Sequence, residues 1–305
     1  MTTLDLLILA LLLDALIGDP DALWRRLPHP AALMGRAIAG FDRAWNRAPW
    51  QRGGGIAALA LLLAGVTGIG LAIGHLPAAP FWELGLAAIL LAQNSLTTHV
   101  GAVARALEQG IEPGRSAVAA IVGRDPAQLD APGIIRAAIE SLAENFSDGV
   151  VAPAFWFALF GLPGILAYKL VNTADSMIGY KTERHHDFGW AAARLDDLMN
   201  WVPARLSALL IAAAHASPHA VRVMRRDARL HRSPNAGWPE AATAAVTGIA
   251  ISGPRSYDGR MSDDPFVHPE GRHNLIPADI DRAIRAIWRA WGLGLVLLIL
   301  IRSLL

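Results

Sequence analysis

Residues 54–76 form an apolar run that contains no Asp, Glu, Lys or Arg. Its length exceeds the roughly 20 residues that a helix needs to cross the hydrocarbon core of a bilayer. The whole chain shares this bias, because 53% of its residues are hydrophobic and only 17% are charged, against about 25% charged in soluble proteins. The sequence therefore predicts an integral membrane protein.

Further apolar segments accompany this run: residues 4–17, 82–100, 150–170, 201–214 and 291–301. Residues 82–100 follow a proline-containing turn, so we expect them to form a helical hairpin with residues 54–76. No Lys or Arg precedes residues 4–17, as a secretory signal would require, so we expect that segment to be retained. Arg285, Trp288 and Arg289 before the last segment are typical of an interfacial anchor.

The segment 150–170 carries a break signal at its centre. Gly161-Leu162-Pro163-Gly164 is typical of a turn and divides the segment into halves that are too short to span. Irregular backbone at that depth is tolerated where it is buried in protein or lines a cavity. No sustained period-2 pattern predicts a sheet. We therefore predict an all-α, polytopic integral membrane bundle with broken or re-entrant helices and cytoplasmic helical loops, formed by residues 1–305 as a single domain.

The distribution of basic residues predicts the orientation. Six arginines lie within residues 18–52, whereas the turn 75–80 has no Lys or Arg. The positive-inside rule places residues 18–52 in the cytoplasm, and we expect residues 101–149 on the same side. The topology after Val150 stays open, because it depends on whether the two proline-interrupted segments span.

Composition and motifs exclude several classes of function. The chain has no cysteine, which rules out disulfides, a thiol nucleophile and Cys-ligated metal centres. A formal net charge of +1 gives no general attraction to nucleic acid. Neither a G-x-x-x-x-G-K-[ST] P-loop nor a G-x-S-x-G elbow occurs. A nucleotide would therefore need a phosphate-binding site of a type other than these motifs.

Three carboxylates recur at helical spacing before the broken segment. Glu140, Glu144 and Asp148 follow i, i+4, i+8 and would form one stripe on a helix. Like charges at this spacing repel by about a few tenths of a kcal/mol, so we expect an offset such as Mg²⁺, arginine or a cationic ligand. The alternative interpretation is a solvated helix face.

A second polar group begins at Lys169, with Asn172 and Ser176 at i+3 and i+7 and Asp175 beside them. An ammonium group suits phosphate as a point charge. The alternative is that Lys169, at an apolar boundary, extends its charge to the membrane surface.

Arg194, Asp197, Trp201 and Arg205 follow i, i+3, i+7, i+11, which one helical face would present together. An arginine inside an apolar segment indicates a functional site by default. The alternative for Arg205 is an ion pair with Asp196 or Asp197.

Glu183, His185, His186 and Asp187 have the side chains of metal ligands. Neighbouring residues on a helix point apart, however, and this segment contains neither H-x-x-x-H nor H-E-x-x-H. We therefore expect basic residues of this loop to contact phosphate rather than a dedicated zinc site.

Long ordered motifs over most of the chain resemble the CobD/CbiB family of cobalamin biosynthesis proteins. The N-terminal motifs are Leu13-Asp14, Ile17-Gly18-Asp19-Pro20, Leu27-Pro28-His29-Pro30, Met34-Gly35-Arg36 and Ile121-Val122-Gly123-Arg124-Asp125. The later motifs are Glu140-Ser141-Leu142-Ala143-Glu144-Asn145, Asp148-Gly149-Val150-Val151-Ala152-Pro153, Tyr168-Lys169, Val171-Asn172-Thr173, Asp175-Ser176-Met177, Gly179-Tyr180, Phe188-Gly189-Trp190 to Asp197 and Ser233 to Ala241. Departures at Phe146-Ser147 and His185-His186-Asp187 leave the most distinctive charges untouched.

The resemblance implies adenosylcobinamide-phosphate synthase activity in cobalamin biosynthesis. Such an enzyme uses ATP and Mg²⁺ to join the free carboxylate of adenosylcobyric acid to the amine of aminopropanol or its O-phosphate. The family is embedded in the bacterial inner (cytoplasmic) membrane, and we expect the active site to face the cytoplasm. The resemblance implies that the corrinoid is a substrate and the lipid bilayer a partner, and that no nucleic acid is involved. It is compatible with a homo-oligomer or with association with other late cobamide enzymes.

This chemistry fits the polar residues by charge type, and the resemblance does not assign their roles individually. Amide formation requires an activated carboxylate, bound phosphates and exclusion of water. We expect Glu140, Glu144 and Asp148 to hold Mg²⁺ or the substrate ammonium, and Asp175, Asp196 or Asp197 to act as general base. Phosphate contacts are expected from Lys169, Lys181, Arg184 and Arg194, and substrate hydrogen bonds from Asn172 and Asn235.

A membrane transporter is the main alternative, because intramembrane charges and broken helices also line substrate pathways. No paired inverted repeat is visible, which disfavours it. A lipid-pathway phosphotransferase would need an ordered series of acidic residues beyond Asp148-Gly149. A scaffold for other cobamide enzymes is a third alternative.

Overall fold

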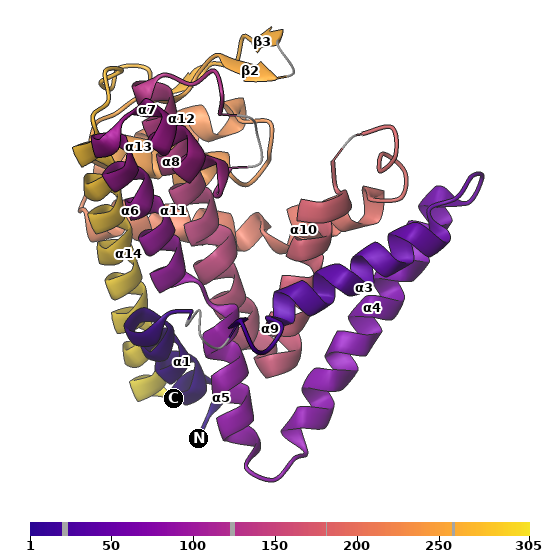
Figure 1. Ribbon diagram of the computed structural model, residues 1–305. Helices are drawn as coiled ribbons and strands as arrows, with labels where there is room; N and C mark the ends of the chain where they lie inside the picture. Colours follow the sequence, from indigo (N-terminus) through magenta and orange to yellow (C-terminus); the bar gives the residue numbers. More distant parts are fainter. Residues whose placement is uncertain (20–23, 123–125, 181, 258–259) are drawn as a thin grey trace. The chain divides into compact units, whose positions relative to one another are not determined.

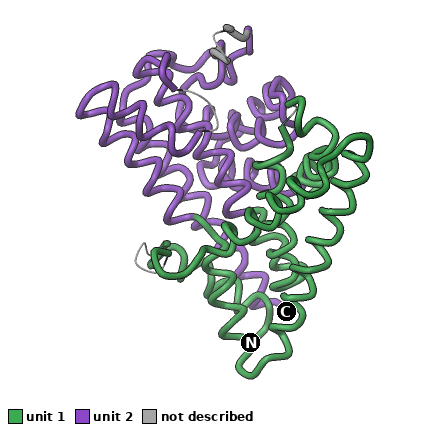
Figure 2. The backbone as a smooth tube through the Cα atoms, turned by 45° about the vertical axis from the view of Figure 1, so that its right-hand side comes forward, with its two compact units in different colours: residues 1–92, 152–200 green, residues 93–151, 201–305 purple. Residues whose placement is uncertain are grey.

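The computed structural model describes residues 1–19, 24–122, 126–180, 182–257 and 260–305. Helices dominate (Figure 1), which confirms the predicted all-α class. The chain forms two compact units, each built from two separate segments (Figure 2). Unit 1 is Met1–Ala92 with Ala152–Asn200, and unit 2 is Gln93–Val151 with Trp201–Leu305. The single domain over residues 1–305 stays a prediction.

Unit 1 is organised around its longest helix. Its helices are α1 (Thr3–Ile17), α3 (Pro30–Trp45), α4 (Gln51–Gly74), α5 (Ala79–Leu90), α9 (Ala152–Ile178) and α10 (Trp190–Met199). The other five pack against α9. Phe157 and Tyr168 of α9 are fully buried, as are Leu7, Ile38 and Leu90 from three of the neighbours. These apolar contacts form the core of the unit.

The first apolar segment is a helix with a defined start. The Thr2 hydroxyl accepts a hydrogen bond from the Asp5 backbone N–H, and the Asp5 carboxylate accepts one from the Thr2 N–H. This capping box satisfies two amide donors that the first helical turn leaves unpaired. The expected helix over residues 4–17 is therefore confirmed as α1, although Asp5 and Asp14 interrupt its apolar sequence.

The predicted hairpin is present, but its second arm is shorter than expected. Helices α4 and α5 pack against each other across a turn at residues 75–78. The expected helix over 82–100 ends at Leu90, because Leu91 is extended with ψ 159°. The chain resumes as α6 (Gln93–Gln109), which belongs to unit 2.

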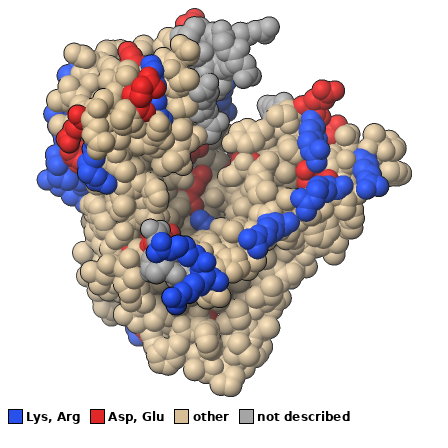
Figure 3. All heavy atoms as spheres, viewed as in Figure 1, with Lys and Arg blue, Asp and Glu red and all other residues tan. Residues whose placement is uncertain are grey.

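Four stretches of the described residues are long and apolar enough to cross a membrane: Gln51–Gly74, Ala79–Gln109, Ala131–Ile178 and Pro277–Leu304. Only 17% of the most apolar window of α4 is buried inside the protein. In Figure 3 tan atoms cover most of α4 and α5, whereas basic side chains gather over α3. Because an apolar face of this size is rare on a soluble monomer, the bilayer is the environment that covers it.

The break predicted inside residues 150–170 is confirmed as a kink in α9. Gly161 has φ 62° and ψ −149°, a backbone conformation that residues other than glycine rarely adopt. Pro163 follows two residues later and lacks the N–H that would continue the helical hydrogen bonds. Helix α4 approaches closely here, since a Cβ added to Gly70 would lie 2.9 Å from Pro163.

Unit 2 is a second helical assembly with a small strand-containing cap. Its elements are α6, α7 (Ile111–Ala119), α8 (Ala131–Phe146), η1 (Ser147–Val151), α11 (Trp201–Ala214), α12 (Pro218–Asp227), η2 (Ala228–Leu230), α13 (Gly237–Thr247), β1 (Ile251–Ser252), β2 (Arg255–Tyr257), β3 (Arg260–Ser262), β4 (Phe266–Val267) and α14 (Pro277–Leu304). Asp130 caps the start of helix α8, because its Oδ1 accepts a hydrogen bond from Gly133 N at 2.8 Å. Its face of Ile135, Ile139 and Leu142 is fully buried.

Small residues allow α13 to lie close to its neighbours. Ala241, Ala242 and Ala244 are fully buried, and the helix packs against α8, α11, α12 and α14. The expected C-terminal segment 291–301 lies within α14. The strands were not predicted, because pairs of two or three residues (β1 with β4, β2 with β3) are too short to show a period.

Replacing Gly161 by alanine is expected to lower the stability of the folded protein by about 1–3 kcal/mol, because the backbone of an alanine is strained at this positive φ. Gly68→Ala is the matched control, since Gly68 lies in α4 with open space where the Cβ would go. That change is expected to be neutral or stabilising by up to about 1 kcal/mol. Thermal unfolding in detergent measures both, and equal midpoints for the two variants would show that the kink does not require glycine.

Candidate functional site

A buried carboxylate in unit 1 is surrounded by amide donors. Asp196 on α10 is 8% exposed. Its Oδ1 accepts a hydrogen bond from Asn172 Nδ2 of α9 at 3.3 Å, and its Oδ2 accepts one from Asn200 Nδ2 at 3.0 Å. The Tyr168 hydroxyl donates to Asn200 Oδ1 at 2.9 Å. Two of the predicted site residues, Asn172 and Asp196, are therefore in direct contact.

Burial raises the pKa of the Asp196 carboxyl to about 6, and the neighbouring Asp197 carboxylate acts in the same direction. The amide donors of Asn172 and Asn200 oppose this shift. The folded protein therefore retains a proton on Asp196 between about pH 4 and pH 6 that the unfolded chain has lost. It follows that this group's contribution to stability falls as the pH rises through about 6.

The other predicted residues of unit 1 lie in varied surroundings. Lys169 and Asp175 on α9 are half-buried. Arg194 and Asp197 on α10 lie one turn apart, with Nη1 and Oδ2 separated by 3.9 Å. Arg184 is held by Asp42 of α3, because its Nη2 donates to Asp42 Oδ2 at 2.6 Å. Lys181 lies outside the described residues.

The predicted residues of unit 2 include one deeply buried acid. Glu140 on α8 is 6% exposed, and its Oε1 accepts a hydrogen bond from the Ser252 backbone N–H at 2.8 Å. The Ser252 hydroxyl lies 3.4 Å from Oε2 of Glu240, which is 2% exposed. His231 Nε2 lies 3.5 Å from the other Glu240 oxygen. Two buried carboxylates thus flank one strand residue.

A small cavity of about 110 Å³ opens beside this cluster. It is lined in part by His231, Arg232, Ser252 and Asp264. Arg232 Nη2 donates to Asp264 Oδ1 at 3.0 Å. The cavity wall therefore offers an imidazole, a hydroxyl and a guanidinium that is already paired with a carboxylate, which suits a small polar group.

The three carboxylates expected on one stripe have different environments. Helix α8 ends at Phe146, and the π-helical turn η1 begins at Ser147, so Asp148 departs from the α-helical spacing. Glu140 is buried, Glu144 is exposed and Asp148 is half-buried. A π turn within a helical stretch frequently marks a functional position. Glu144 and Asp148 are accessible to a hydrated cation, and the metal-ligand role stays a prediction.

Asn235 and Arg205 meet within unit 2. Arg205 Nη1 donates to Asn235 Oδ1 at 3.2 Å and to the Trp201 carbonyl at 2.7 Å, and its guanidinium lies against the Trp238 ring. The expected single face through Arg194 and Arg205 is wrong, because α10 ends at Met199 and a new helix begins at Trp201.

Several residues of these clusters escaped prediction. Tyr168 and Asn200 complete the Asp196 network, but their pairing over 32 positions has no local signal. Glu240 lies within the motif from Ser233 to Ala241, but no role was predicted for it. A lone carboxylate on an otherwise alanine-rich helix was the available signal, because burial of such a group requires polar partners.

These features define a polytopic helical membrane protein with buried carboxylates in both of its units. The CobD/Cbib protein family matches residues 7–287. "Cobalamin biosynthesis protein CobD" of Rhizobium meliloti is 50% identical over 93% of this chain and 92% of the relative. The proteins of the same name from Brucella anthropi, 49% identical over 96% of both chains, and Rhodobacter capsulatus, 46% identical over 96% of this chain and 95% of the relative, are also similar.

No solved structure matches the chain. The extent of the family match and the identity over nearly the full length establish that the chain belongs to the CobD/CbiB family.

Glu140→Ala is expected to cost about 1–3 kcal/mol of stability, because it leaves the buried Ser252 N–H without its acceptor. Glu140→Gln keeps an oxygen at that position and is expected to lose less. Glu144→Ala, at an exposed position of the same helix, is expected to change stability by no more than about 0.5 kcal/mol. Thermal unfolding of the three variants in detergent tests this order, and equal losses at both positions would contradict it.

Proposed function

We propose that the chain is an ATP-dependent acid–amine ligase of cobalamin biosynthesis. It would join the free carboxylate of adenosylcobyric acid to the amine of aminopropanol or its O-phosphate, giving adenosylcobinamide or its phosphate. The names of the relatives support the pathway. The observation that carries the chemistry is the buried Asp196 carboxyl with its pKa of about 6.

Asp196 is the best candidate for the general base among Asp175, Asp196 and Asp197. Amide formation makes a C–N bond at the activated carboxyl carbon, expels the activating phosphate, and releases one proton from the amine nitrogen. A base whose pKa lies near the working pH accepts such a proton most effectively. The donors from Asn172 and Asn200 fix the orientation of the carboxylate. Asp175 and Asp197 are the alternative bases.

Cationic and amide side chains would bind the remaining parts of the substrates. Lys169, Lys181, Arg184 and Arg194 are assigned to the phosphates of ATP or aminopropanol phosphate. Asn172 and Asn235 are assigned to substrate hydrogen bonds. The guanidinium of Arg184 is supported by Asp42, which orients it while leaving 60% of its side chain exposed.

Magnesium fits the acidic residues of unit 2. Mg²⁺ prefers carboxylate oxygens, and in ATP-dependent enzymes one or two carboxylates usually hold it together with waters and substrate phosphates. The exposed Glu144 and half-buried Asp148 suit that mode, and the buried Glu140 lies four residues before Glu144 on the same helix. Bound Mg²⁺ would neutralise phosphate charge, and ATP would supply the energy for carboxylate activation.

The proposed location is the bacterial inner membrane, with the reaction on the cytoplasmic side. Helix α3 carries Arg36 and Arg43 on the segment that the positive-inside rule assigns to the cytoplasm. ATP is a cytoplasmic substrate, which agrees with this orientation. A homo-oligomer or an assembly with other late cobamide enzymes is compatible with this location.

The pH dependence of kcat/KM tests the role of Asp196. The base acts only when ionised, so kcat/KM is expected to fall as the pH decreases through about 6. Asp196→Asn is expected to lower kcat by about 10²–10⁴-fold and to abolish this acidic limb. Asp197→Asn should retain activity and shift the limb to lower pH, because a like charge beside Asp196 is removed. An unchanged profile in Asp196→Asn would assign the base to another residue.

Amide formation by the purified protein in detergent tests the proposed reaction. Wild-type protein should give an ATP- and Mg²⁺-dependent product, and alanine at Glu144 or Lys169 should abolish it while leaving membrane expression intact. Near-wild-type turnover in both variants would place the reaction at other residues. If wild-type protein forms no product but moves a corrinoid across vesicle membranes, the transporter alternative replaces this proposal.

A further inference from the structure

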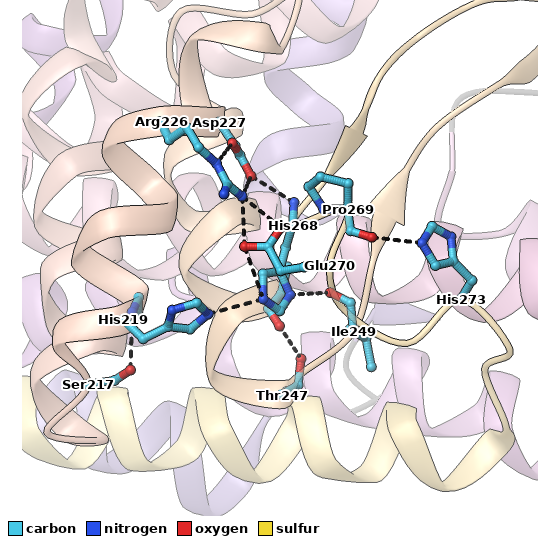
Figure 4. Close-up of polar contacts among 12 residues, drawn as sticks. Ser217, His219, Arg226, Asp227, Thr247, Ile249, His268, Pro269, Glu270 and His273 are labelled. Atoms are coloured by element: carbon cyan, nitrogen blue, oxygen red, sulfur yellow. Dashed lines mark hydrogen bonds and ion pairs between the residues drawn. The ribbon is translucent and has the colours of Figure 1, made fainter.

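Two histidines of unit 2 direct the same ring nitrogen toward each other. His219 lies in the first turn of α12, and His268 directly follows β4. Their Nε2 atoms are 3.1 Å apart, and the ring planes are inclined at 66° (Figure 4). Two neutral imidazole nitrogens at this distance either share a hydrogen or share a cation.

The second nitrogen of His268 determines which form that ring takes. Nδ1 lies 2.9 Å from the Ile249 carbonyl oxygen. A carbonyl oxygen only accepts hydrogen bonds, so Nδ1 carries the hydrogen, and in the neutral ring Nε2 presents its lone pair. Donation from the far nitrogen to a backbone carbonyl is also the usual way in which a metal-binding histidine is oriented.

A carboxylate completes the group. Glu270 Oε1 lies 3.9 Å from His268 Nε2, and one ligand atom from each of His219, His268 and Glu270 lies within 4.8 Å of the other two. Two nitrogens bound to one tetrahedral zinc at 2.0–2.1 Å are about 3.3 Å apart, so the histidine pair already has nearly the required spacing. Among the described residues, this is the group that brings three such ligands together.

The surrounding residues hold the ligands in place. His268 is 4% exposed and has φ 56°, which residues other than glycine seldom adopt. Its backbone N–H donates to Oδ2 of the buried Asp227 at 2.8 Å. Arg226 Nη2 donates to Asp227 Oδ2 at 2.8 Å and to both Glu270 oxygens at 2.9 Å. The guanidinium therefore fixes the carboxylate and balances part of the negative charge.

We propose that His219, His268 and Glu270 bind a divalent transition-metal ion of the zinc class, through two imidazole Nε2 atoms and one carboxylate oxygen. Imidazole selects zinc, cobalt, nickel or copper, whereas Mg²⁺ selects oxygen ligands, so this site is distinct from the proposed Mg²⁺ site. Three protein ligands leave a fourth position for water. The ion would tie the start of α12 to the segment after β4, and β4 pairs with β1, the strand that carries Ser252.

Cobalt titration of the full-length protein tests the site. Purified protein in detergent is stripped with a chelator, and Co²⁺ is added while its visible ligand-field absorption is recorded. Wild-type protein is expected to bind one Co²⁺ per chain with a tetrahedral or five-coordinate spectrum. Zn²⁺ should displace it and raise the thermal unfolding midpoint.

His219→Ala and Glu270→Gln are the main variants, because His268 is buried and its replacement could prevent folding. Each is expected to weaken Co²⁺ binding by about tenfold or more and to remove the midpoint shift with Zn²⁺. His215→Ala is the matched control: His215 stands four residues before His219 in the sequence but lies outside the ligand group, so this variant should bind like wild type. The proposal fails if wild-type protein binds Co²⁺ no more strongly than His219→Ala, or if His215→Ala loses as much binding as His219→Ala. His219 and His268 would then share only a hydrogen bond between their rings.

Discussion

A backbone amide in hydrocarbon has no water to bond with, so the chain must satisfy it internally, and this constraint determines most of the structure. It explains why the apolar segments form long helices, and why irregular backbone inside them needs protein around it. The kink at Gly161 in α9 meets this condition, since α4 packs against Pro163 at the same level. Helix α9 continues on both sides of Gly161, and the chain changes direction at the kink.

Both units bury acidic side chains, and in both the buried carboxylate accepts hydrogen bonds from nearby donor groups. Asp196 receives two side-chain amides, and Glu140 receives the Ser252 N–H. An unpaired buried carboxylate would be strongly disfavoured. Burial raises the pKa of Asp196 to about 6 against the opposing effect of these donors, and this raised pKa is what supports the proposed role as general base.

Local sequence patterns predicted the helix α4 and the break in α9, but they did not predict the side-chain clusters. The uncharged run at 54–76 and the Gly-Leu-Pro-Gly signal depend on neighbouring residues, and α4 and the kink in α9 agree with them. By contrast, Tyr168 meets Asn200, and Glu140 meets Ser252, only after the chain has folded back on itself. His219 and His268 are 49 positions apart. His215 and His219 have the H-x-x-x-H spacing of some metal sites, which was not predicted from the sequence, and the structure pairs His219 with His268 rather than with His215.

The interleaved composition of the two units has a consequence for synthesis. Unit 1 receives its second segment, Ala152–Asn200, only after the first segment of unit 2 has been made. The nascent chain must therefore keep the apolar surfaces of α1, α4 and α5 covered by lipid or insertion factors until α9 emerges. Neither unit is contiguous in the sequence, so a truncation at any of the three boundaries between segments leaves at least one unit without its partner segment.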